Sequence, residues 1–405
     1  MKILIVMDQL PPHLTATSGI MYELGEWLST NYGIDVSFLG NCRGDAKSPF
    51  RMWGSTELFR YSELVPSELS KWKKTIKIAA HPSVWGTRMA LSSHPRYPLQ
   101  KIYKRLLKQA LKEEPNFDCI ICATNPWDTV VAAADIVGSI PLVVYKADPW
   151  GTNSYCIGDR NYWEDEQRID ERCSAIFVPT PVYQDYVSGI NLAPLEKVHK
   201  VEFPNIKKPV WNEELKPSFA DGKIHCAFVG QLYSNIRKPD FMFELFENLK
   251  EKNVVLHIVG NTETQAQEYR DKLPSNIILH GMVSPEEASM YMQASNILVN
   301  LGNTVANQLP SKLISYMACG KPIINICKIS NCLSIPYMEK YPLSFTMMES
   351  DALTPEFIKQ VEEFCFENSK KTLSFSNVKE TFYECTPEYV GKMVYDALCD
   401  ITKKN

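Results

Sequence analysis

One stretch organises this sequence: Asn307-Gln-Leu-Pro-Ser-Lys-Leu-Ile-Ser-Tyr-Met-Ala-Cys-Gly-Lys-Pro-Ile-Ile324. It predicts a loop, then a helix, then a buried strand. Pro310 suits the first helical position, because its fixed φ matches the helix and its missing N–H would have no partner there. Gly320 suits a left-handed helix cap, and the isoleucines from Ile323 onward indicate a strand. Apolar residues recur between them at helical spacing, which predicts a face packed on a core: Leu313, Ile314, Met317 and Ala318.

The first turn of this predicted helix carries Ser311 and Lys312. A helix N-terminus presents free backbone N–H groups and the positive end of the helix dipole, which together favour an anion. A lysine side chain adds a full positive charge. The spacing alone leaves a second interpretation open, in which Lys312 is a solvated lysine on a surface helix.

The first half of the chain alternates apolar strands with helices. Residues 2–7 form a continuous apolar run, as expected of a parallel strand buried on both faces. We expect a loop from Asp8 to Gly19, then a helix that ends at Tyr32-Gly33, and a second strand at 34–39. Such a β-α-β unit binds ligands at the carboxyl ends of its strands. No Gly-x-Gly-x-x-Gly follows the first strand, which argues against an enzyme that uses nicotinamide or flavin.

A second strand–helix series begins after a polar, proline-rich segment at 207–222, which we interpret as a linker. Ser284 and Glu287 have the spacing of a capping box at the start of one of its helices. Further strands are predicted at 225–230, 254–260, 276–281 and 296–300. A chain of 405 residues is long for one core. We therefore predict an α/β fold of two Rossmann-like domains, 1–206 and 223–385, followed by a helical segment at 386–405.

Composition narrows the class of protein. A net charge of -4 and a pI of about 6.1 argue against a general nucleic-acid binder, so no nucleic-acid partner is expected. The 12 cysteines are scattered. Cys119 and Cys122 lie inside an apolar run, where alternation points the two thiols to opposite faces, so we interpret them as core residues. Without a signal peptide or a long apolar run, we expect a cytoplasmic protein.

The segment Pro310-Ser311-Lys312, then Tyr316, then Gly320-Lys321-Pro322 resembles the donor-binding segment of GT-B glycosyltransferases, and most closely the retaining group called family 4. The resemblance implies that Lys312 and the helix start hold the diphosphate of a nucleotide-sugar. The family carries two glutamates eight positions apart in this segment, and here Asn307 and Ser315 stand at those places. The resemblance also implies that residues 386–405 pack back on the first domain.

The same resemblance assigns other residues to the donor. Arg237 would hold the diphosphate together with Lys312, since guanidinium groups match phosphate oxygens; the alternative is an exposed loop arginine. Gly19 would face the sugar, although it is also interpretable as an ordinary loop glycine. Gly260, Met282 and Val283 match the nucleobase positions. The whole implied donor set is Gly19, Gly230, Gln231, Lys238, Gly260, Met282, Val283, Asn307, Leu309, Pro310, Ser311 and Ser315.

Asp148 is the candidate on the acceptor side. It follows a strand predicted at 142–145, and a polar residue there faces the ligand crevice. The family places a histidine just before it, where this chain has Ala147. The alternative role for Asp148 is an Asx turn before proline. No Asp-x-Asp occurs in the sequence, so we expect no metal and no cofactor, with Arg237 and Lys312 stabilising the leaving diphosphate.

Residues 71–112 contain many lysines and arginines and no acid. Basic residues alternate there with Trp72, Tyr97 and Tyr103, and Leu106 and Leu107 form an apolar pair. This pattern predicts contact with an anionic membrane or acceptor, with shallow insertion of the aromatic and apolar residues. The alternative is a solvated helix whose apolar side belongs to the core.

We therefore expect a glycosyltransferase that retains anomeric configuration and uses a nucleotide-sugar, with a UDP-sugar favoured and a GDP-sugar as the alternative. The acceptor would be a hydroxyl group of a glycan or a lipid-linked glycan. The expected location of the protein is the cytoplasm or, as a peripheral protein, the inner face of the membrane. Two other functions stay open: a nucleotide-sugar epimerase of similar fold, and a non-catalytic nucleotide-sugar-binding homologue, because Asn307 and Ser315 replace the glutamates.

Overall fold

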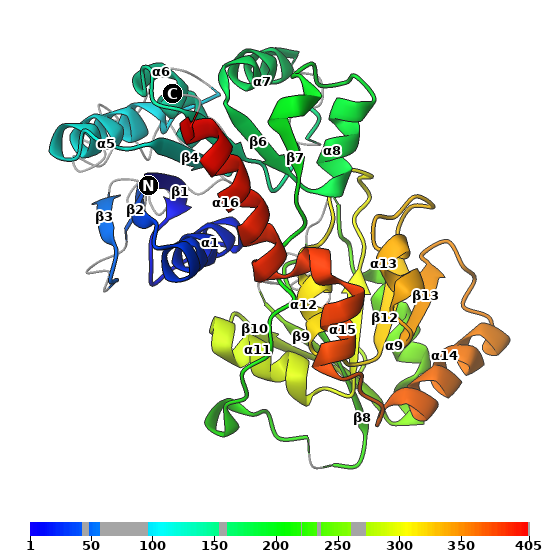
Figure 1. The fold of residues 1–405 in the computed structure, drawn as a ribbon. Coiled ribbons are helices and arrows are strands. Elements are labelled where there is room, and N and C mark those ends of the chain that lie inside the picture. The colour runs from blue at the N-terminus through cyan, green and yellow to red at the C-terminus, as the bar shows by residue number, and fades with distance from the viewer. Residues whose placement is uncertain are drawn as a thin grey trace, which may run out of the picture. The chain divides into compact units, whose positions relative to one another are not determined.

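The structure is a computed structural model, and it describes residues 1–42, 48–56, 96–153, 160–219, 221–232, 236–260 and 273–403. The chain divides into two compact units (Figure 1). The first consists of Met1–Glu202 and Pro387–Asn405, and the second of Phe203–Thr386. The expected linker at 207–222 thus falls within the second unit. Both units are parallel α/β sheets, so the predicted fold class is confirmed.

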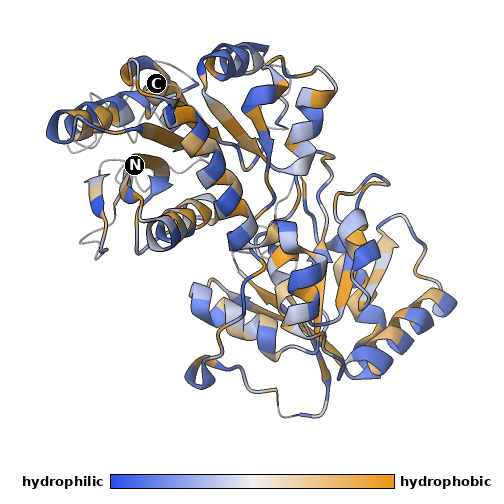
Figure 2. Ribbon diagram, in the orientation of Figure 1, coloured by the Kyte–Doolittle hydropathy of each residue, from blue (hydrophilic) through white to orange (hydrophobic). Residues whose placement is uncertain are grey.

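The described part of the first unit has a seven-stranded parallel sheet in the order β3-β2-β1-β4-β5-β6-β7. Its strands are β1 (Lys2–Gln9), β2 (Asp35–Asn41), β3 (Arg51–Ser55), β4 (Cys119–Ala123), β5 (Leu142–Tyr145), β6 (Ala175–Val178) and β7 (Val198–Lys200). The strand order changes direction between β1 and β4, which makes their carboxyl ends the switch point of this sheet. Apolar residues fill the strands, as their colours in Figure 2 show.

The helices of this unit are α1 (Ala16–Tyr32), α5 (Gln100–Glu113), α6 (Asp128–Ile136), α7 (Arg160–Arg172), α8 (Thr180–Val187) and α16 (Pro387–Lys403). Thr15 caps α1: its hydroxyl accepts from the Ser18 N–H at 3.2 Å, and the Ser18 hydroxyl accepts from the Thr15 N–H at 2.7 Å. The helix therefore begins at Ala16 and includes Gly19. The prediction that Gly19 lies in a loop is wrong, because this reciprocal cap starts the helix earlier.

Helix α5 settles the role of an apolar pair in the basic region. Tyr103, Leu106 and Leu107 are buried in the core of the first unit, and Tyr97 is buried beside them. The predictions that Leu106 and Leu107 insert into a membrane and that Tyr97 and Tyr103 lie at its headgroups are wrong, because these residues are buried in the core. Trp72 and the rest of 71–95 lie outside the described residues. No described helix is long and apolar enough to span a bilayer.

Helix α16 ends the chain and packs on α1 (Figure 1). The rings of Tyr395 and Tyr32 stack with their centroids 3.6 Å apart. Gly391 faces the Trp27 ring so closely that a Cβ atom would overlap the indole. A glycine at this position therefore allows the two helices to touch.

The described part of the second unit has a six-stranded parallel sheet in the order β10-β9-β8-β11-β12-β13. Its strands are β8 (Ile224–Val229), β9 (Val254–Val259), β10 (Ile277–Gly281), β11 (Ile297–Leu301), β12 (Ile323–Cys327) and β13 (Ser344–Met348). Its helices are α9 (Asp240–Asn248), α11 (Pro285–Ala294), α12 (Lys312–Ala318), α13 (Ile335–Lys340), α14 (Pro355–Asn368) and α15 (Phe375–Thr381). The switch point of this sheet lies between β8 and β11.

The two predicted helix signals of this unit have different outcomes. Ser284 and Glu287 form the predicted capping box at the start of α11. Helix α12 begins at Lys312, because the Pro310 carbonyl first accepts from the Leu313 N–H at 3.0 Å in a separate turn. Pro310 is therefore not the first helical residue. Gly320 has φ of 69° and ends the helix as predicted.

Candidate functional site

Glycines occupy the carboxyl ends of four neighbouring strands in the second unit. Gly230, Gly260 and Gly302 directly follow β8, β9 and β11, and Gly281 is the last residue of β10. Gly260 has φ of 136°, and a Cβ atom on it would overlap the Gly230 carbonyl. Glycine at position 260 therefore allows the backbones after β8 and β9 to approach closely, at the edge where ligands of parallel α/β sheets bind.

Two loops meet at the switch point, one after β8 and the other after β11. The Arg237 guanidinium donates to the Asn303 side-chain oxygen from Nε at 2.9 Å and from Nη2 at 2.6 Å. Its Nη1 donates to the Gln231 carbonyl at 3.4 Å. The Thr304 N–H donates to the Ile236 carbonyl at 3.0 Å, which joins the two backbones. Arg237 is thus fixed at the carboxyl end of β8 rather than left mobile on a loop.

Lys312 is the first residue of α12 and its side chain is exposed. Desolvation by the surrounding protein lowers the pKa of Lys312. Cys319 opposes this effect in part, and the charge of Lys207 adds the smallest contribution, which again lowers the pKa. Within the described part of the chain, no carboxylate contributes to raising this pKa. A bound anion would stabilise the charged form of the ammonium group.

Tyr316 connects α12 to the strand that Gly230 ends. Its buried hydroxyl accepts from the Val229 N–H at 2.7 Å and donates to the Val229 carbonyl at 3.1 Å. Burial raises the pKa of Tyr316, and the charge of Arg237 opposes that rise. The helix that carries Lys312 is therefore anchored at the place where the Arg237 loop begins.

The sequence of this unit resembles a known family. Residues 223–332, which span β8 to β12, match the family described as glycosyl transferases group 1. The chain carries a group 1 glycosyltransferase domain. Gly230, Arg237 and Lys312 all lie within that matched segment. No curated protein sequence matches the chain significantly.

Solved structures of glycosyltransferases resemble the whole chain. HepE of Anabaena in complex with UDP has a TM-score of 0.61 at 14% identity, covering 99% of this chain and 100% of that chain. WaaG, a glycosyltransferase involved in lipopolysaccharide biosynthesis, has a TM-score of 0.60 at 13% identity, covering 99% of both chains. The galactosyltransferase WaaB has a TM-score of 0.56 at 13% identity, again covering 99% of both. This likeness establishes the GT-B fold.

The expected donor residues of the glycosyltransferase domain share the carboxyl edge of its sheet. Met282 is 73% exposed and follows β10 with Val283, which is half-buried. Between β11 and α12 and on α12 itself, Leu309 and Pro310 are buried while Asn307, Ser311 and Ser315 are half-buried. Gln231 and Lys238 are exposed on the loop after β8. Gly19 and Asp148 belong to the first unit, where Asp148 is half-buried after β5.

Asn303, which contacts Arg237, was not predicted from the sequence. Its signal was weak, since an asparagine after a strand and a glycine is common in loops. Asp8 and Asp128, which lie at the switch point of the first unit, were not predicted either. Burial raises the pKa of Asp128 to about 6. Burial also raises the pKa of Asp8, whose carboxylate accepts from the Thr15 hydroxyl at 3.0 Å. An acid directly after the first predicted strand was a signal available from sequence.

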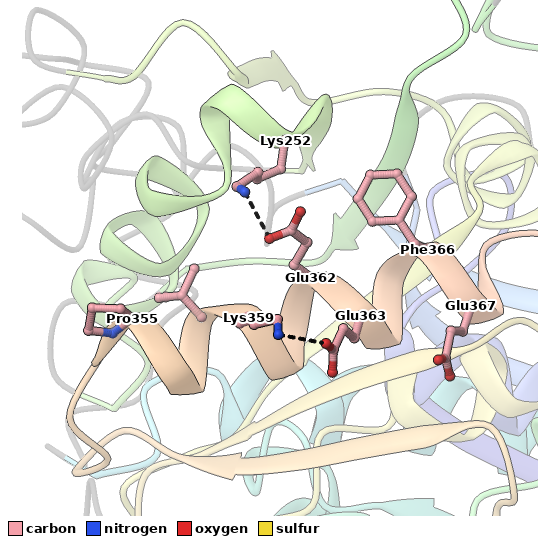
Figure 3. A pocket seen from close by; sticks show the side chains of 8 residues that line it. Lys252, Pro355, Lys359, Glu362, Glu363, Phe366 and Glu367 are labelled. Carbon is pink, nitrogen blue, oxygen red and sulfur yellow. Dashed lines mark ion pairs between the residues drawn. The ribbon is translucent and has the colours of Figure 1, made fainter.

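A cavity elsewhere in the second unit lies between α14 and the turn that contains Lys252 (Figure 3). Its cations are paired with acids, Lys252 with Glu362 at 3.1 Å and Lys359 with Glu363 at 3.6 Å. Its lining contains none of the expected donor residues. We therefore do not assign the nucleotide-sugar to this cavity.

Proposed function

We propose that the chain transfers a sugar from a nucleotide-sugar, a UDP-sugar before a GDP-sugar, to a hydroxyl group of a glycan or lipid-linked glycan. The observation that carries this proposal is the placement of Arg237 and Lys312. They come from two elements that are bonded to each other at the switch point of the matched domain. Two cations at a sheet edge, one of them on the first residue of a helix, suit a diphosphate.

In the proposed reaction the acceptor oxygen bonds to the anomeric carbon and releases its proton. The bond between the sugar and the diphosphate breaks, and negative charge accumulates on the leaving diphosphate. The Arg237 fork and the Lys312 ammonium would stabilise that charge without a metal ion. Retention at the anomeric carbon is what the family resemblance implies. The choice of uridine is supported by HepE, which was solved with UDP and with UDP-glucose.

Thermal shift tests the donor part of this proposal. A ligand that binds only the folded protein raises its melting temperature by mass action. We expect UDP to raise it more than GDP, ADP or dTDP, and EDTA to leave both that shift and turnover unchanged. A shift that disappears with EDTA and returns with Mg²⁺ would contradict binding by cations alone.

We further propose peripheral attachment to an anionic membrane through the basic side of α5, where Lys101, Arg105 and Lys108 are exposed. Each basic residue near such a surface contributes about 1 kcal/mol. Co-sedimentation with anionic vesicles should weaken with salt and should fall when Lys101, Lys104, Arg105 and Lys108 are changed to Gln. Wild-type protein that stays in the supernatant at low salt would refute this attachment and would leave the donor site untouched.

A further inference from the structure

Asn303 contacts Arg237, one of the two cations of the proposed donor site, and the loop that leads to the other. It is 4% exposed, and its side chain bonds on both sides. Its oxygen accepts from Arg237 twice, at 2.9 and 2.6 Å, and its amide nitrogen donates to the Gln308 carbonyl at 3.0 Å. A guanidinium carries donors alone, so the oxygen of Asn303 must be the atom that faces Arg237.

The backbone around Asn303 is fixed on both sides. The Gly302 N–H donates to the Ile326 carbonyl at 2.8 Å, and the Thr304 N–H donates to the Ile236 carbonyl at 3.0 Å. A Cβ atom at Gly302 would come within 3.0 Å of the Cys332 sulfur, so this approach is close. Asn303 is therefore held by β12 on one side and by the Arg237 loop on the other.

The bond to Gln308 extends this support toward α12. From Gln308 the chain passes through Leu309 and Pro310, both buried, to Ser311 and Lys312 at the start of the helix. One side chain thus links the guanidinium of Arg237 to the loop that leads to Lys312. Movement of this loop would shift one cation relative to the other.

The chemistry of the amide matters as much as its position. An aspartate at this position could also accept both N–H groups, but its negative charge would compensate the guanidinium and compete with a ligand phosphate. It would also lose the donor to Gln308. A neutral amide orients Arg237 and leaves its full charge available to an anion.

We propose that Asn303 is a positioning residue that holds Arg237 and the loop before Lys312 in register for the two phosphates of the donor. This inference rests on the proposed function, because it presumes a diphosphate at Arg237 and Lys312. It adds to that site a residue that acts on the ligand through Arg237. It also predicts that position 303 needs a neutral side chain, and that an aspartate of similar shape does not replace it.

Calorimetric titration with UDP tests this role in Asn303→Ala, Asn303→Asp, Arg237→Ala and the double variant that combines Asn303→Ala with Arg237→Ala. We expect Asn303→Ala to weaken UDP binding roughly tenfold or more, since it releases a charged hydrogen-bonding group. Asn303→Asp should weaken it as well, even with an unchanged melting temperature. The double variant should bind no more weakly than Arg237→Ala alone, because both changes act on one interaction.

The matched control is Asn276→Ala. Asn276 is similarly buried, and its amide donates to the Phe246 and Val254 carbonyls at 2.7 and 3.0 Å, at the amino end of the same sheet. It should lower the melting temperature and leave the UDP affinity unchanged. UDP binding that needs Arg237 but is unchanged in Asn303→Ala, or losses that add in the double variant, would overturn the positioning role alone. Wild-type protein that does not bind UDP, GDP, ADP or dTDP would overturn the proposed function with it.

Discussion

Gly260 and Gly19 show how differently two glycines of one expected donor set are placed. Gly260 has a left-handed φ and no room for a Cβ atom, whereas Gly19 lies in the first turn of α1 with nothing near its Cβ position. We expect Gly260→Ala to lower the melting temperature markedly or to prevent folding. Gly19→Ala should stabilise the first unit by about 1 kcal/mol, as alanine does in a helix. Thermal unfolding of the two variants measures both effects, and equal destabilisation would contradict this assignment.

Single residues were predictable where their role follows from local sequence. Gly320 as a helix cap and Ser284 as the start of α11 were correctly predicted, because each depends on a few neighbouring residues. Asn303 and Arg237 are 66 positions apart, and their contact exists only because β8 and β11 are adjacent in the sheet. Sequence patterns carry no information on such a pair.

At the scale of elements, a chain of histidines crosses three neighbouring strands of the second unit. The Asp221 carboxylate accepts from His225 at 2.8 Å, His225 and His257 are joined at 2.9 Å, His257 and His280 at 2.9 Å, and His280 and Tyr291 at 2.9 Å. An ionised carboxylate only accepts, so His225 donates from Nε2. With three neutral rings, every histidine then donates from Nε2 and accepts at Nδ1, and the Tyr291 hydroxyl donates to His280.

This chain predicts a stability that depends on pH. Burial lowers the pKa of His257 to about 4 and also lowers the pKa of His280. A histidine in the unfolded chain has a pKa near 6.5. Between pH 6.5 and the lower pKa of the folded chain, the unfolded chain binds a proton that the folded chain does not bind. The contribution of these neutral histidines to the free energy of unfolding is fully present above about pH 6.5. Loss of the contribution of His257 alone should lower the free energy of unfolding by about 3 kcal/mol at pH 4.

Calorimetry of unfolding between pH 7.5 and 4.5 measures this effect. His257→Gln should be less stable at neutral pH and should show a shallower decline with acid than the wild type. His199→Gln, in the first unit, is a comparison variant. Burial lowers the pKa of His199 too, so this change should also make the decline with acid shallower. Identical pH slopes for the wild type and His257→Gln would refute the explanation.

Some elements were predicted wrongly, because the same sequence pattern occurs in two different environments. The apolar face of α5 would look the same in sequence whether it met a membrane or a core, and the structure shows Leu106 and Leu107 in the core. Strands β3 and β13 were not predicted at all. Each is short, and neither has the continuous apolar run that identified β1 or β9.

At the scale of the molecule, the sequence contains two successive α/β series, and the structure forms a parallel sheet from each. This agreement has a physical cause, since buried parallel strands need continuous apolar runs that are easy to recognise. The division into units was less visible. The polar segment at 207–222 belongs to the second unit, while the last helix, from Pro387 onward, joins the first. The sequence of such a helix shows that it is amphipathic, but it does not show which unit the helix packs on.

The most direct measurement is the release of UDP from labelled UDP-sugars by the wild type, Lys312→Ala and Lys359→Ala. Lys359 is an exposed lysine on α14 that pairs with Glu363 and serves as the control. We expect sugar transfer by the wild type and by Lys359→Ala, and a loss of roughly 10²–10³ in kcat/KM for Lys312→Ala with an unchanged melting temperature. Binding without turnover would identify a non-catalytic homologue, and an isomerised sugar still attached to UDP would identify an epimerase. Wild-type kcat/KM in Lys312→Ala would contradict the claim that Lys312 stabilises the leaving diphosphate.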